Sequence, residues 1–209
     1  MTTPIPLNLA VEDSLTESLF AKILDTIPTQ YATRTIYNRG GYGYLRQNIN
    51  GFNHAAKGVP FLVGTDLDKY ECPAALIQEW VIGQRHDNLL IRVAVREVEA
   101  WVLADGKNFA KFLGIREALV PDDVEKVPDP KQELIRLARR ARSRDLRDDL
   151  CPPSNSTRKV GPNYNARLAI FVQRHWDPNA AKERAESLAR AIDRLIAFRP
   201  TWPTPPEVQ

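Results

Sequence analysis

Cysteine is scarce in this chain, with only Cys72 and Cys151 among 209 residues. Two cysteines in unrelated sequence contexts are too few for a disulfide framework or a four-cysteine zinc site. No apolar run approaches the roughly 18 residues that a membrane-spanning helix needs. Residues 1–6 lack the basic and apolar segments of a signal peptide. We therefore expect a protein of the reducing cytoplasm.

Other residues and motifs of common chemistries are also missing. The three histidines, His54, His86 and His175, show no metal-ligand spacing to one another or to a cysteine. The sequence contains no Gly-x-Ser-x-Gly motif and no phosphate-binding P-loop. It therefore gives no support to zinc or acyl-transfer chemistry, and any ATP-driven step would need a second protein.

Charge is abundant but unevenly distributed along the chain. Residues 1–129 carry 13 basic and 17 acidic side chains, a balance of −4, whereas residues 130–209 carry 16 and 9, a balance of +7. An acidic half beside a basic half suggests a metal site next to a surface that binds a polyanion such as nucleic acid. The alternative is an ordinary solvated face rich in arginine.

Hydrophobic patterning predicts an α/β fold. Short apolar runs at 7–11, 33–37, 59–65 and 88–95 are typical of buried strands. Helical stripes lie between them, and the first is expected to begin at Ser14 with a capping box completed by Glu17. This alternation predicts a mostly parallel, four-stranded Rossmann-type core with helices on both faces.

The pattern changes beyond about residue 116. Prolines punctuate a linker, helices are expected near 131–142, 163–174 and 179–197, and the polar stretch 145–159 is expected to be a long loop. The sequence thus predicts an α/β domain over 1–120 and a basic helical extension packed on it over 121–199. A proline-rich tail over 200–209 completes the predicted organisation.

Three acidic residues follow predicted strands. Glu12 follows the first strand, and Asp66 and Asp68 follow the third. Because the carboxyl ends of parallel strands share one edge of the sheet, we expect these side chains to meet there. Their mutual repulsion favours a shared cation, and hard oxygen ligands suit Mg²⁺ or Mn²⁺.

The same segments resemble a known family. Residues 11–17, Val-Glu-Asp-Ser-Leu-Thr-Glu, resemble the first Toprim motif, and residues 61–68, Phe-Leu-Val-Gly-Thr-Asp-Leu-Asp, resemble the second. Residues 96–105 are similar to a segment of uncharacterised bacterial Toprim-like proteins encoded beside ATPases in defence islands. A more distant resemblance is to the nucleases associated with overcoming lysogenization defect. Asp13 is a departure, since Toprim proteins usually have glycine there.

The resemblance implies a metal-dependent nuclease acting on DNA or RNA in antiviral defence, with a separate ATPase as partner. Glu12 would act as general base or metal ligand, and Asp66 and Asp68 would hold Mg²⁺ or Mn²⁺. Glu97 or Glu99 would supply a further ligand, as in nucleases that use two metal ions. We favour Glu99 slightly. The alternative is that Glu97 and Glu99 are both solvated acids on the surface.

Basic residues supply candidate contacts to nucleic acid. Arg39 and Arg46 flank a glycine-rich stretch, 38–46, that either cradles phosphate or forms a plain turn. Its Tyr42 and Tyr44 could stack on unpaired bases or simply pack. The remaining candidates for phosphate binding come from the C-terminal part, with Lys159 also a candidate to neutralise charge on the scissile phosphate: Arg136, Arg139, Arg140, Arg158 and Lys159.

Two other functions are compatible with these patterns. The first is a non-catalytic Toprim-fold subunit that binds a partner ATPase or nucleic acid without cutting it. The second is a phosphotransferase of the haloacid-dehalogenase type with Asp66 as nucleophile. That scheme leaves Glu12 without a role, and residues 71–73 do not continue its usual motif.

Overall fold

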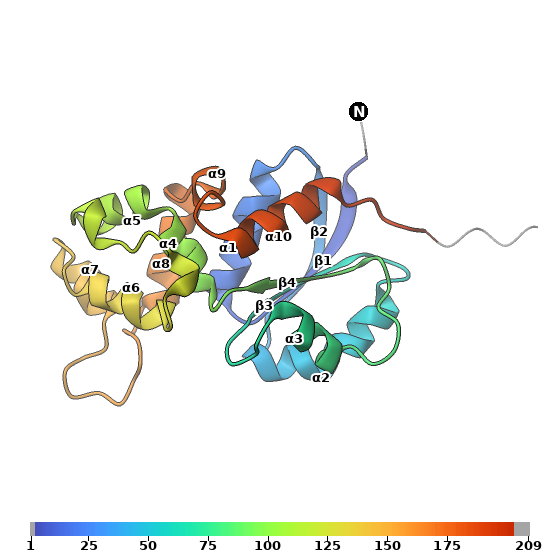
Figure 1. The fold of residues 1–209 in the computed structure, drawn as a ribbon, viewed down its shortest axis with the longest axis horizontal. Coiled ribbons are helices and arrows are strands. Elements are labelled where there is room, and N and C mark those ends of the chain that lie inside the picture. The colour runs from blue at the N-terminus through green and yellow to red at the C-terminus, as the bar shows by residue number, and fades with distance from the viewer. Residues whose placement is uncertain (1–2, 203–209) are drawn as a thin grey trace, which may run out of the picture.

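The computed structural model describes residues 3–202, and a sheet of four parallel strands lies at its centre (Figure 1). The strands lie side by side in the order β2-β1-β3-β4, so the first and third strands are direct neighbours. The prediction of an α/β fold around a parallel four-stranded core is confirmed. The strand bounds are β1 Ile5–Val11, β2 Tyr31–Tyr37, β3 Phe61–Asp66 and β4 Leu89–Ala94.

Helices cover both faces of the sheet (Figure 1). On one face, α1 (Ser14–Thr26) and α10 (Glu186–Ala197) bury their apolar side chains in one cluster. On the other face, α2 (Gly41–Ala55) and α3 (Pro73–Trp80) form a second cluster. At the end of β1, Leu9 and Val11 lie in the first cluster and Ala10 between them lies in the second, as the pleat of a strand requires. The prediction of helices on both faces is therefore confirmed.

Beyond β4 the chain forms a helical region beside the sheet (Figure 1). Its apolar residues join the cluster that contains α1, and Trp176 donates its indole N–H to the carbonyl of Trp101 at 3.0 Å in that core. The boundary near residue 120 stays a prediction. The main helices of the region are α4 Val98–Ala104, α5 Gly106–Leu113, α6 Pro130–Ala138, α7 Arg144–Leu150, α8 Tyr164–Arg174 and α9 Pro178–Ala181.

Helix α1 begins differently from the prediction. Asp13, not Ser14, is the N-cap, and its Oδ1 accepts hydrogen bonds from the backbone N–H and the hydroxyl of Thr16, both at 2.9 Å. Glu17 accepts a hydrogen bond from Asn38 instead of closing a capping box. The predicted capping box is therefore wrong. An aspartate at this position caps as well as serine does, and its charge also complements the positive end of the helix.

Three other local predictions need correction. The glycine-rich stretch 38–46 is mostly helix, since α2 begins at Gly41. The expected loop 145–159 contains most of α7, a helix capped by Ser143 whose polar sequence buries only Leu150. The single helix expected over 179–197 is two helices, α9 and α10. In each case tertiary packing or capping decided what a weak local pattern left open.

The strand order reverses between β1 and β3. Helix α1 connects β1 to β2 on one side of β1, and the chain then returns to β3 on the other side. In open parallel sheets, ligands bind at the carboxyl ends of strands where the order reverses. Glu12 follows β1 and Asp66 ends β3, so the two acids share this edge as expected.

Within residues 3–202, no helix is both long and apolar enough to cross a lipid bilayer. Near the end of this range, the backbone N–H of Thr201 donates to the side-chain oxygen of Asn88, which ties the chain to the start of β4. Most of the predicted proline-rich tail, residues 203–209, lies outside the described residues.

Gly64 is the one position of β3 where a side chain would collide with α1. A Cβ atom there would lie 2.2 Å from the Phe20 ring. We predict that Gly64→Ala lowers the free energy of unfolding by about 1–3 kcal/mol, because overpacking forces the ring to move. Gly51→Ala is the matched control, because a Cβ at this exposed position of α2 meets no atom within 4 Å. It should raise stability by up to about 1 kcal/mol. Urea unfolding measures whether the free energy of unfolding falls for Gly64→Ala and rises for Gly51→Ala.

Candidate acidic site at the sheet edge

The carboxylate of Glu12 points at the turn that follows β3. Its Oε1 accepts the backbone N–H of Asp66 at 2.9 Å and the hydroxyl of Thr65 at 2.5 Å. Both donors come from a segment more than 50 positions away, and they lie beside Glu12 because β1 and β3 are paired. The predicted meeting of Glu12 with the Asp66 segment is therefore present.

Asp66 lies deeper in the same edge. Its Oδ1 accepts the backbone N–H of Val98 at 2.9 Å, which joins the end of β3 to the start of α4. Burial raises the pKa of Asp66 well above its usual range, and the negative charges of Glu99 and Glu12 add to this shift. The charge of Lys131 acts in the opposite direction. Asp66 is thus surrounded by both signs of charge.

Asp68 occupies an exposed and unusual turn. Its φ of 49° lies in the left-handed region, where aspartate is tolerated better than most non-glycine residues. The turn is tied to the end of β4, because the N–H of Asp68 donates to the carbonyl of Arg96 at 3.1 Å. In return, the guanidinium of Arg96 donates to the carbonyl of Asp68 at 3.3 Å. Leu67 between the two aspartates is buried and anchors the turn.

Glu97 and Glu99 are both engaged by one lysine that the sequence did not single out. The Nζ of Lys131 lies 3.3 Å from Oε1 of Glu99 and 3.7 Å from Oε1 of Glu97. The backbone N–H of Lys131 also donates to Oε2 of Glu97 at 3.0 Å, so this carboxylate sits at the start of α6. Glu97 thus complements the positive end of a helix.

Glu99 is the most deeply buried acid of the site, with 1% of its surface exposed. The hydroxyl of Tyr164 donates to its Oε1 at 3.1 Å. Among the described residues, its Oε2 is buried without a hydrogen-bond partner. Burial raises the pKa of Glu99 to about 7, and the charge of Lys131 opposes that shift. Glu99 is therefore not a solvated surface acid, and its role as a metal ligand stays a prediction.

The carboxylate of Glu12 also has a raised pKa. Burial is the largest cause, and the charges of Asp68 and Asp13 contribute, whereas the hydrogen bonds from Thr65 and Asp66 oppose the shift. Asp13 itself is held by its role as N-cap and by Asn165 of α8, whose Nδ2 donates to its Oδ2 at 3.2 Å. The helical region therefore reaches the sheet edge through Lys131, Tyr164 and Asn165.

The donors suit a divalent cation in chemistry but do not form a closed cage. Carboxylate oxygens are the ligands that Mg²⁺ and Mn²⁺ prefer. Across residues 3–202, no three histidine, cysteine, aspartate or glutamate side chains converge in a geometry that could hold a metal ion. Mg²⁺ in proteins commonly uses only one or two carboxylates and completes its shell with water and phosphate oxygens. Glu12, Asp66 and Asp68 are the residues that could hold such an ion.

A cavity of about 470 Å³ opens beside Asp68. Its walls include two cationic side chains, Lys69 and Arg96, and two aromatic ones, Tyr42 and Tyr70. The hydroxyls of the two tyrosines lie 3.1 Å apart. Cations that bind phosphate and rings that stack on bases are the groups that nucleic-acid-binding proteins use. Sequence reasoning found Tyr42 but missed Lys69, Tyr70 and the cationic role of Arg96.

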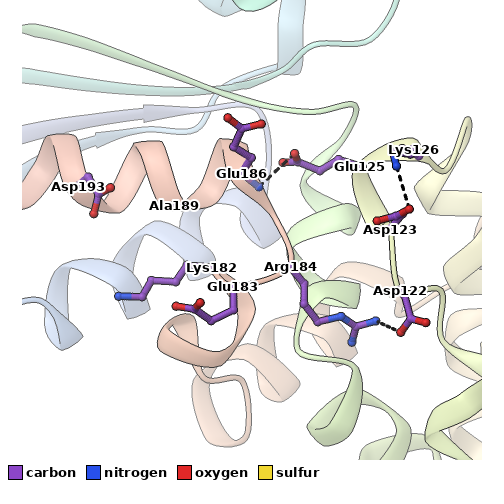
Figure 2. Close-up of a pocket in the computed structure, with 10 residues that line it drawn as sticks. All are labelled: Asp122, Asp123, Glu125, Lys126, Lys182, Glu183, Arg184, Glu186, Ala189 and Asp193. Atoms are coloured by element: carbon purple, nitrogen blue, oxygen red, sulfur yellow. Dashed lines mark hydrogen bonds and ion pairs between the residues drawn. The ribbon is translucent and has the colours of Figure 1, made fainter.

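A larger cavity, of about 860 Å³, lies apart from these residues, around the start of α10 (Figure 2). Figure 2 shows Glu125 accepting the backbone N–H of Glu186, a contact that caps this helix. Arg184 pairs with Asp122 across the same hollow at 3.2 Å. Because Glu125 and Arg184 join the start of α10 to residues 121–125, we assign this cavity a role in packing.

The predicted basic candidates are scattered rather than gathered at the site. Arg46 pairs with Glu79 at 2.7 Å and Arg136 pairs with Glu133 at 2.5 Å, so both are partly neutralised. The remaining candidates are exposed on three different segments, and Lys159, like its neighbour Arg158, lies on the loop between α7 and α8: Arg39, Arg139, Arg140, Arg158 and Lys159. In the described part of the chain, the ammonium group that reaches the acidic cluster is that of Lys131.

Fold and site together define an α/β protein with a parallel sheet and an acidic edge at its point of strand reversal. Comparison with known proteins adds no relative, since no family model, no curated protein and no solved structure matches the chain. The Toprim resemblance therefore remains a prediction from the motifs at residues 11–17 and 61–68.

The raised pKa of Glu99 predicts a dependence of stability on pH. The folded protein holds this proton up to about pH 7, whereas the unfolded chain releases it near 4.5. The folded state therefore binds more protons between these values, and its free energy of unfolding falls as pH rises through them, by roughly 3 kcal/mol at most. Glu99→Gln should lack this part of the decline. Urea unfolding in EDTA from pH 5 to 8 measures it, and parallel curves for the two proteins would contradict the assignment.

Proposed function

We propose that the protein is a divalent-metal-dependent nuclease of Toprim type. The observation that carries the proposal is the hydrogen bond, 2.9 Å long, between the carboxylate of Glu12 and the backbone N–H of Asp66. It brings two acids from distant parts of the sequence to the place where open parallel sheets bind ligands. Burial raises the pKa of both, and neighbouring carboxylates add to the shift, Asp68 and Asp13 at Glu12 and Glu99 and Glu12 at Asp66, a combination typical of functional carboxylates.

Mg²⁺ or Mn²⁺ is the proposed cofactor, held by carboxylates from the set Glu12, Asp66 and Asp68. When bound, such an ion supplies an activated water and neutralises charge on a phosphate. The protein's own contribution is to orient these acids, since Thr65 fixes Glu12 and the N–H of Val98 fixes Asp66. The cavity beside Asp68 provides the entry for a nucleic-acid strand, with Lys69 and Arg96 for phosphate groups.

A binding subunit without nuclease activity is the second candidate. The observation that favours it is the absence, across residues 3–202, of a ready group of three metal ligands. As part of either proposal we retain a separate ATPase partner and a role in defence, which the Toprim-like resemblance implies, and the cytoplasmic location expected from the sequence. The exposed Cys72 and the buried Cys151, both free thiols, are compatible with a reducing compartment.

The first test of catalysis is the variant Asp66→Ala. We expect it to lower cleavage of labelled single- and double-stranded DNA and RNA in Mn²⁺ by about 100-fold or more. Asp123→Asn is the matched control, because this exposed acid pairs with Lys126 away from the sheet edge. Circular dichroism verifies the fold. Undiminished cleavage by folded Asp66→Ala would remove the nuclease proposal, and binding without cleavage by the wild type would favour the second candidate.

The cavity beside Asp68 gives a prediction about binding. Replacing Lys69 and Arg96 by glutamine should weaken nucleic-acid binding and reduce the slope of log affinity against log salt by about 0.7–0.9 for each phosphate group that the variant no longer neutralises. Arg136→Gln should change the slope less, because Glu133 already neutralises that guanidinium. Fluorescence anisotropy in EDTA, at several salt concentrations, measures all three proteins. Equal slopes for the double variant and the wild type would mean that the nucleic acid does not bind at Lys69 and Arg96.

A further inference from the structure

We propose that the ammonium group of Lys131 takes the place of a second divalent ion at the acidic edge, so that the protein binds one metal ion and not two. The inference rests on the proposed function, because it concerns the number of ions at the same site. It assigns Glu97 and Glu99 to a cation that is part of the chain. Glu12, Asp66 and Asp68 are left for the ion from solution.

The position of the ammonium group supports this assignment. Nζ of Lys131 lies within 4 Å of one oxygen of Glu99 and one oxygen of Glu97, at 3.3 and 3.7 Å. The Toprim resemblance implies that one of these two acids, Glu97 or Glu99, would be the additional ligand of a two-metal site. A divalent ion bound by the same oxygens would lie almost in contact with the ammonium group. Two positive charges at that distance repel one another strongly unless the surrounding negative charge outweighs both.

The lysine is held in place by the fold. Pro130 and Lys131 open α6, whose N-cap Asp129 accepts the N–H of Gln132 at 2.8 Å. The backbone N–H of Lys131 also donates to Glu97, so the start of α6 and the lysine side chain both contact this carboxylate. About a third of the lysine side chain is exposed, with 32% of its surface accessible. The ammonium is thus a fixed part of the edge rather than a mobile surface charge.

Unused ligand capacity remains at Glu99. Tyr164 and Lys131 both engage Oε1, while Oε2 is buried and, among the described residues, has no hydrogen-bond partner. A buried carboxylate oxygen without a partner is costly in any folded protein. Removing the ammonium would therefore leave two carboxylates in one place, one of them with this unpartnered oxygen. That combination should attract a divalent ion that the wild-type protein excludes.

The test is the number of Mn²⁺ ions that the full-length chain binds, measured by isothermal titration calorimetry and by electron paramagnetic resonance. We expect one ion per chain for the wild type and two for Lys131→Met, in which an apolar side chain of similar length replaces the lysine. The two ions of the variant should give a spin-coupled signal. Lys126→Met is the matched control and should keep one ion, because Lys126 pairs only with the exposed Asp123 among the described residues.

Each outcome separates the inference from the function on which it rests. Two ions in the wild type, or one ion in folded Lys131→Met, would overturn the role of Lys131 and leave the nuclease proposal standing. No ion in the wild type would remove both. If Lys131→Met unfolds in EDTA, recovery of its fold by Mn²⁺ supports the inference. Failure to recover, while the double variant Lys131→Met with Glu99→Gln folds, contradicts it. Lys131→Arg, which keeps the charge, should bind one ion.

Discussion

Repulsion among carboxylates at one edge of the sheet is the constraint on which the rest of this structure depends. Pairing of β1 with β3 brings Glu12 to the Asp66 turn, and Glu99 follows one strand further along. Burial removes water that would otherwise screen these charges. Hydrogen bonds from backbone N–H groups and one hydroxyl stabilise the carboxylates, and the ammonium group of Lys131 compensates part of their charge.

This constraint also explains why the helical region docks where it does. Lys131 at the start of α6 and Tyr164 at the start of α8 both reach Glu99, and Asn165 reaches Asp13. Each of these interactions joins a residue beyond position 130 to an acid of the sheet edge. Apolar packing around Trp101 and Trp176 fills the core of this region, but it lacks the direction that charge and hydrogen bonding provide. The polar interactions therefore specify how the helices sit on the sheet.

The proposed chemistry follows from the same arrangement. Asp68 and Glu97 line the cavity, whose walls also carry cationic and aromatic side chains and Asp129, while Glu99 is buried and contacts Lys131 and Tyr164. A phosphate group entering beside Asp68 would meet the acids that line the cavity first. The edge thus has an exposed acid, Asp68, beside the cavity and a buried acid, Glu99, that pairs with Lys131.

The sequence by itself determined the strands, the helices between them apart from the start of α2, and the carboxylates at the ends of two strands. These features depend on local periodicity and on the rule that parallel strands share a carboxyl edge. Capping was less certain, since Asp13 and Ser14 are both good N-caps and only the surrounding structure selects one. Helix α7 was missed because its polar sequence carries almost no apolar stripe.

Tertiary structure alone decided the partners of the acids. Lys131 lies 32 positions after Glu99 and Tyr164 lies 65 positions after it, and no local pattern connects them. Sequence reasoning chose Lys159 for the cation of the site, but that residue lies on an exposed loop. Such pairings exist only after the helical region has docked on the sheet, and that docking combines apolar packing with polar contacts from many residues. A charged partner that lies two or three helices further along the chain than its acid can therefore be identified only from the tertiary structure.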